Sequence, residues 1–131
     1  MVINEQGEKK MSLSISSEMK EPGVYFLHLA GSLDTNTFMS LEKRAEEILA
    51  MTPRAIVLDM KELDYISSMG VRAVLKTRKA MQEIGGKLAL VNVQPGVKKV
   101  FEIINALPSQ RIFSNIQELD NYLDQMQKNV R

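Results

Sequence analysis

The 131-residue chain contains no cysteine and no tryptophan, and it has a single histidine, His28. Without cysteine it can form no disulfide, zinc–thiolate site or iron–sulfur cluster, and it has no cysteine nucleophile. One histidine also excludes a multi-histidine metal cage. The chain contains neither a G-x-G-x-x-G motif nor a P-loop sequence. We therefore expect no metal site and no cofactor.

Charge of one sign and long apolar runs are also lacking. Lys and Arg number 17 against 16 Asp and Glu, which gives a net charge of +1, and aromatic residues make up 5%. This balance supplies no field for nucleic acid or anionic lipid, and few rings for base stacking. No segment approaches the ~20 apolar residues of a membrane span, and the start lacks a secretory signal pattern. We expect a cytoplasmic protein that binds neither nucleic acid directly nor membrane.

Hydrophobic periodicity predicts the order β-β-α-β-α-β-α-β-α over residues 12–131, after a flexible N-terminal lead-in of residues 1–11. The predicted strands are Ser12–Met19, Val24–Ala30, Ala55–Met60, Lys87–Val93 and a short one around Ile112 and Phe113. Four amphipathic helices are predicted, from Phe38 to before Pro53, from Val71 to Gly85-Gly86, from Pro95 to before Pro108, and behind Asn115. This alternation predicts one α/β domain with a mainly parallel sheet, which the opening hairpin makes mixed.

Function in such sheets gathers where strands lead into helices. Three such loops are predicted, Gly31–Thr37, Leu63–Gly70 and Val93–Gly96, and only Leu63–Gly70 (LDYISSMG) is chemically distinctive. Its serines, Ser67 and Ser68, precede Gly70. They can serve simply as helix caps. Alternatively, a hydroxyl at a helix N-terminus is a place where a phosphate is tolerated and changes the charge of the surface.

Three segments resemble STAS domains, the anti-sigma-factor antagonist family. LDYISSMGVRAVL (63–75) is similar to the signature loop, GSLD (31–34) to the turn before the first helix, and VNVQPGVKKVFEIINAL (91–107) to the third βα unit. The resemblance runs from about Ser12 to the C-terminus, and it implies the same fold as the periodicity. Three matching segments in the right order make it specific.

The resemblance implies a partner-switching regulator of transcription and not an enzyme. Such proteins bind an anti-sigma factor with serine kinase activity while unphosphorylated, and phosphorylation of a loop serine inactivates them until a serine phosphatase restores them. Alignment on the glycine places that serine at Ser68, with Ser67 as the alternative. Ser67 stands where family members carry aspartate, and Met69 where a small serine or threonine is common. The partner-binding residues implied are Asp34, Ser67, Ser68, Met69, Gly70 and Arg72.

Several of these residues have a plainer interpretation. Asp34 is equally expected to be a helix N-cap. Arg72, Lys76 and Lys79 form a charged helical face that is either solvated or attractive to an acidic partner. Asp59 either faces the serine loop or satisfies nearby backbone N–H groups.

Two other functions remain open. The first is a phosphorylation-independent STAS interaction module, in a signalling scaffold or as a small-ligand sensor. The second is a serine hydrolase, which would need His28 as the base for Ser67 or Ser68. The hydrolase motif G-x-S-x-G is not matched, because Ile66 stands where its first glycine is required.

Overall fold

The computed structural model describes residues 2–3, 9–10, 12–106 and 115–129. Two short strands come first, β1 (Val2–Ile3) and β2 (Lys9–Lys10), and they pair with each other. The main sheet consists of β3 (Leu13–Glu21), β4 (Val24–Leu33), β5 (Ala55–Ile66) and β6 (Lys87–Val91). The helices are α1 (Phe38–Leu49), α2 (Ser68–Glu83), α3 (Pro95–Ala106) and α4 (Ile116–Lys128).

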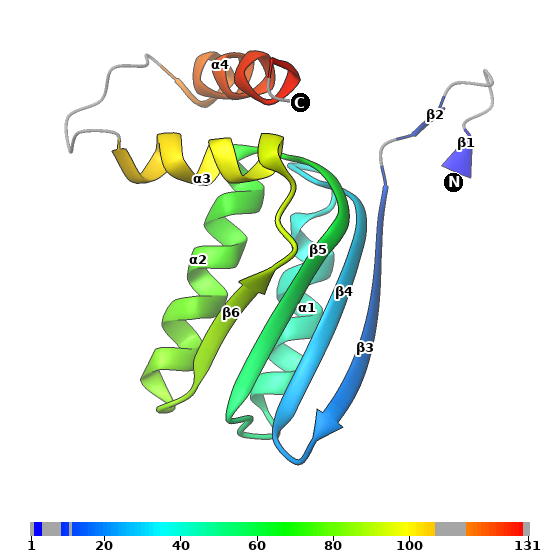
Figure 1. Cartoon of the computed structure of the whole chain (residues 1–131), viewed down its shortest axis with the longest axis vertical. Coiled ribbons are helices and arrows are strands. Elements are labelled where there is room, and N and C mark those ends of the chain that lie inside the picture. The colour runs from blue at the N-terminus through cyan, green and yellow to red at the C-terminus, as the bar shows by residue number, and fades with distance from the viewer. Residues whose placement is uncertain (1, 4–8, 11, 107–114, 130–131) are drawn as a thin grey trace.

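The four strands of the main sheet lie in the order β3-β4-β5-β6. β3 and β4 form the predicted antiparallel hairpin, whereas β4 with β5 and β5 with β6 are parallel. α1 and α2 cover one face of the sheet, and α3 and α4 lie across the end where the parallel strands stop (Figure 1). The prediction of a single α/β domain with a mixed, mainly parallel sheet is therefore confirmed.

The core lies between the sheet and helices α1 and α2. Its fully buried side chains come from alternate positions of the central strands, where Leu27, Ile56 and Leu58 expose 0% of their surface. Helical residues such as Leu41, Val74 and Met81 pack against them. Apolar residues two apart on the strands therefore pack against apolar residues three to four apart on the helices, in one layer.

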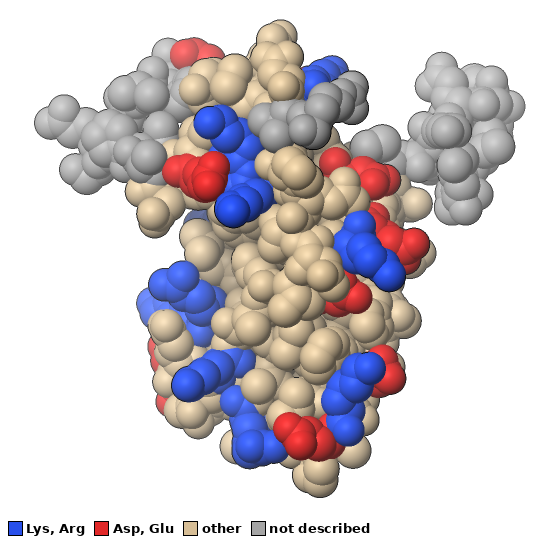
Figure 2. Space-filling view, in the orientation of Figure 1, with Lys and Arg blue, Asp and Glu red and all other residues tan. Residues whose placement is uncertain are grey.

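The other face of the sheet carries no helix in this view (Figure 1). Figure 2 shows this face largely uncharged along its centre, with charged side chains toward its margins. Its central strands contribute half-buried residues, among them Phe26 and Val57, which pair across β4 and β5.

Two predicted strands are longer than expected, and two predicted loops are shorter. β4 continues to Leu33 and β5 to Ile66, because Ser32 pairs with Tyr65 and Leu33 with Ile66. Leu63 and Ile66, predicted to lie in a loop, are fully buried. The prediction that Leu63–Gly70 is a loop was wrong, since continued pairing with β4 keeps residues 63–66 in the sheet and α2 already begins at Ser68. Only Ser67 separates β5 from α2.

Most helix boundaries agree with the predictions. α1 covers the predicted apolar stripe, and α3 begins at Pro95. α2 ends before Gly85, whose φ of +79° is the left-handed conformation expected there. The predicted strand around Ile112 and Phe113 lies outside the described residues. Within the described part of the chain, no helix is long and apolar enough to cross a membrane.

Candidate functional site

The serine segment lies where β5 passes into α2, and its two serines have different roles. Ser67 is the N-cap of α2, and its hydroxyl accepts the backbone N–H of Gly70 at 3.4 Å. Ser68 is the first helical residue. Its Oγ is buried and has no hydrogen-bond partner among the described residues. The capping interpretation therefore applies to Ser67, whereas the Ser68 hydroxyl makes no such bond.

Gly70 brings α2 close to the ends of β4 and β5. A Cβ atom at this position would overlap the carbonyl oxygen of Leu33 and would lie 2.8 Å from Cγ1 of Ile66. The backbone N–H of Ser67 also donates to the Leu33 carbonyl at 3.0 Å. The glycine thus fixes α2 and the serines directly against the sheet.

Asp34 shapes the turn between β4 and α1. Its carboxylate accepts the backbone N–H of Asn36 at 2.9 Å and the hydroxyl of Thr37 at 3.2 Å. The N-cap position itself is occupied by Thr37, whose hydroxyl also donates to the Ser32 carbonyl at 2.7 Å. The prediction of Asp34 as the N-cap was therefore wrong by three residues. Asp34 instead forms an Asx turn with Asn36 before the helix starts.

Helix α4 supplies two site residues that the sequence analysis missed. Asp120 accepts the backbone N–H of Ser68 at 2.9 Å. The side-chain amide of Gln127 forms two bonds with Ile66, accepting its N–H at 2.9 Å and donating to its carbonyl at 2.7 Å. The Gln127 side chain thus makes the two backbone hydrogen bonds that a neighbouring strand would make to Ile66, the last residue of β5.

A groove of about 530 Å³ opens beside this contact, and its lining is acidic. Its residues include Ser67, Tyr65 and the carboxylates of Asp34, Asp120 and Asp124, with Lys128 as the basic residue. Burial raises the pKa of Tyr65 to about 12, and the three carboxylates, Asp124 first, add to the shift. Burial is thus the main cause of the elevated pKa, and the smaller contribution of the carboxylates reflects the negative potential in this groove.

Two predicted partner-binding residues, Met69 and Arg72, line a different groove. This groove lies between α1 and α2, and its other lining residues are Phe38, Glu42, Leu75, Lys76 and Lys79. Arg72, Lys76 and Lys79 are all exposed, and Lys76 pairs with Glu42 at 3.6 Å. Of the six predicted residues, Asp34 and Ser67 therefore line an acidic groove, Met69 and Arg72 line a mainly basic one, and Ser68 and Gly70 lie at the helix start without lining either.

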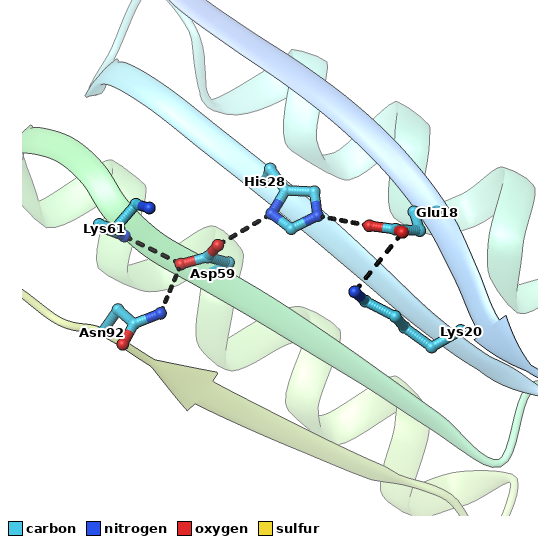
Figure 3. Close-up of polar contacts among 6 residues, drawn as sticks. All are labelled: Glu18, Lys20, His28, Asp59, Lys61 and Asn92. Atoms are coloured by element: carbon cyan, nitrogen blue, oxygen red, sulfur yellow. Dashed lines mark hydrogen bonds and ion pairs between the residues drawn. The ribbon is translucent and has the colours of Figure 1, made fainter.

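His28 belongs to a polar network on the face of the sheet opposite the helices (Figure 3). Its Nδ1 lies 2.9 Å from Asp59 and its Nε2 lies 3.0 Å from Glu18. Carboxylates only accept hydrogen bonds, so the protonated ring satisfies both. The bond to Glu18 and then that to Asp59 raise the pKa of His28.

This network removes the base that a serine hydrolase would need, because both ring nitrogens of His28 face carboxylates and neither faces a serine. It also decides between the two expectations for Asp59. That carboxylate accepts the Asn92 amide, just after β6, at 3.0 Å and the Lys61 N–H of β5 at 3.1 Å, and neither partner belongs to the serine segment. These bonds, with that to His28, lower the pKa of Asp59.

No metal-binding arrangement of three or more His, Asp or Glu side chains occurs in the part of the chain that the structure describes.

Comparison with known proteins agrees with this geometry. The family model for the STAS domain matches residues 18–119, so the chain belongs to the STAS domain family. It is 36% identical over 84 residues to the putative anti-sigma factor antagonist BtrV of Bordetella bronchiseptica, covering 64% of this chain and 72% of that protein. It is 27% identical over 106 residues to the anti-sigma F factor antagonist of Paenibacillus polymyxa, covering 80% and 90%.

Solved structures show the same fold. The unphosphorylated anti-sigma factor antagonist SpoIIAA superposes with a TM-score of 0.64 at 22% identity, over 70% of this chain and 81% of that one. An anti-sigma factor antagonist from Mycobacterium paratuberculosis gives 0.63 at 16% identity, over 86% and 94%.

The two missed residues had a signal in the sequence. Asp120 and Gln127 are spaced by seven, with Leu123 between them, and such residues share one helix face. The prediction of this helix rested on its Asn115 cap and its apolar stripe, in which Leu123 is fully buried.

Proposed function

We propose that this chain is an anti-sigma factor antagonist that binds an anti-sigma factor with serine kinase activity, and that phosphorylation of Ser68 ends the binding. The observation that carries the proposal is the unequal use of the two serines in a STAS-family chain. The Ser67 hydroxyl caps α2, whereas Ser68 Oγ is left without a partner among the described residues.

Ser68 is the better phosphate acceptor of the two for a physical reason. Phosphorylation of Ser67 would remove the cap of α2, and losing a serine cap costs about 0.5–2 kcal/mol. Phosphorylation of Ser68 leaves that cap in place, so the start of α2 is retained while the surface gains about −1.5 to −2 charges.

The proposed partner surface surrounds the start of α2. Met69 and Arg72 with the α1–α2 groove give it apolar and basic contacts, and Asp34 lies on the acidic side. An added phosphate changes the charge at the junction of these two sides, which disfavours a partner that fits the uncharged serine. A serine phosphatase acting on the phosphorylated form would restore binding.

The chain has a binding role in this proposal and performs no catalysis, and it works in the cytoplasm. The STAS domain is assigned to residues 12–131, with residues 1–11 as a lead-in. The related proteins are named as anti-sigma factor antagonists, which supports the proposal that this chain regulates a sigma factor.

The test is affinity capture from a lysate of the native host with wild type, Ser68→Ala and Ser68→Asp as baits, followed by phosphorylation assays with the recovered kinase. We expect an ATP-binding serine kinase on Ser68→Ala and little on Ser68→Asp. Ser67→Ala is the matched control, and it should still accept phosphate when measured by intact mass.

Two results would contradict the proposal. Full phosphorylation of Ser68→Ala would move the modification to another residue, with Ser67 first. Equal recovery of the same partner by all three baits would instead indicate a STAS interaction module that phosphate does not control.

A further inference from the structure

Helix α4 is attached to the site by two polar contacts and one apolar contact on a single face. Asp120 accepts the Ser68 N–H, and Gln127 pairs with the backbone of Ile66. Leu123 lies between them in sequence and exposes 0% of its surface. Residues three, four and seven apart share a helix face, so this face of α4 rests on the β5–α2 junction.

Asp120 occupies the position that an anion prefers at a helix start. The first N–H groups of a helix lack partners within the helix, and its dipole favours negative charge there. A phosphate on Ser68 would compete with Asp120 for hydrogen bonds from these same N–H groups. Because the Ser68 Oγ is already buried, a phosphoryl group on it needs space that neighbouring atoms now occupy.

The charges around Ser68 also oppose a phosphate while α4 stays docked. Asp34, Asp120 and Asp124 line the groove beside Ser67. Lys128 lines it too, but its ammonium already pairs with Asp124 at 2.9 Å. A phosphate beside these carboxylates is repelled by like charge.

We propose that α4 is an intramolecular cover of Ser68, and that α4 docking and Ser68 phosphorylation exclude each other. The proposal rests on Ser68 being the modified residue. Coupling between two such equilibria is reciprocal, so phosphate on Ser68 weakens α4 docking by the same factor by which docking disfavours the phosphorylated state. The kinase acts on the form in which α4 has moved away, and phosphate then keeps α4 away.

The test uses the full chain with phosphoserine installed at position 68 during translation, so that no kinase is needed. Hydrogen exchange of the amides in residues 115–129 is compared with that of the unmodified chain. We expect at least tenfold faster exchange in this segment, with α1 and the middle of β5 unchanged. Phosphoserine at position 40 is the control, because Ser40 is exposed on α1. It should leave α4 protected.

A second variant assigns the effect to Asp120. In an Asp120→Asn background we expect the ratio of phosphorylated to unmodified exchange rates to fall at least threefold, because a carboxylate no longer faces the phosphate. Glu83→Gln removes the same charge at an exposed position at the far end of α2, and it should leave the ratio unchanged.

Equal exchange of residues 115–129 with and without phosphate would overturn the proposal, as would faster exchange over the whole domain. Neither outcome bears on whether a kinase exists, because the phosphoserine is installed synthetically. Conversely, failure to capture a kinase would leave the measured effect on α4 intact.

Discussion

Gln127 offers a direct measure of how strongly α4 is held. Its amide forms bonds of 2.9 and 2.7 Å with the N–H and carbonyl of Ile66, a residue that is 0% exposed. Gln127→Ala leaves both backbone groups without these partners, and each unsatisfied buried group costs about 1–3 kcal/mol. The better helix propensity of alanine returns a few tenths of this. We expect a loss of about 2–5 kcal/mol in the free energy that docks α4.

Native-state hydrogen exchange measures this loss helix by helix, and urea unfolding measures the effect on the whole domain. The loss should be concentrated in residues 115–129. Gln127→Glu has nearly the same shape but cannot donate to the Ile66 carbonyl, so it should also weaken docking. Gln125→Ala is the control, because Gln125 is exposed on the same helix. A change below about 0.5 kcal/mol for Gln127→Ala would refute the reasoning, because that is the usual range for surface substitutions.

Two further substitutions test the α2 start and the sheet network. Gly70→Ala places a Cβ against the Leu33 carbonyl, so unfolding in urea should show a loss of about 1–3 kcal/mol, whereas the exposed Arg72→Ala should not. His28 has a raised pKa, so its contribution to stability is complete below its ordinary value of 6.5 and is lost as pH rises through the raised value. The melting temperature of wild type should therefore fall relative to His28→Gln as the pH rises above 6.5 and through the raised pKa of His28. A constant difference between the two would contradict this assignment.

The elements that the sequence predicted well are those in which the local pattern and the tertiary fold agree. Pro95 at a helix start and Gly85 after a helix end are each favoured by their own backbone geometry. The helix α1 was predicted from a local pattern too, because its apolar residues recur on a single face.

The extension of β5 to Ile66 could not be predicted in the same way. Residues 61–65 are KELDY, which has little apolar alternation, and they are held as strand by pairing with β4. Such pairing depends on a segment about 30 residues away, so it leaves no local signal.

The site was predicted only in part, for a related reason. Ser67, Ser68 and Gly70 are neighbours in sequence, and their helix-start geometry is a local property. Asp120 is 52 residues from Ser68, and only the folded chain brings the two together. A polar residue on an otherwise apolar helix face is the one sequence feature that marks such a contact.

The position of Asp120 also bears on how this chain differs from the family pattern. Ser67 stands where the resembling antagonists carry aspartate, so the loop itself has no carboxylate next to Ser68. In this fold, α4 brings a carboxylate to the same helix start from the other end of the sequence. A carboxylate in the loop would stay beside the serine in every state, whereas Asp120 leaves when α4 undocks. Under the exclusion proposed above, the charge of Asp120 next to Ser68 depends on the position of α4, and a partner that displaces α4 also removes that charge.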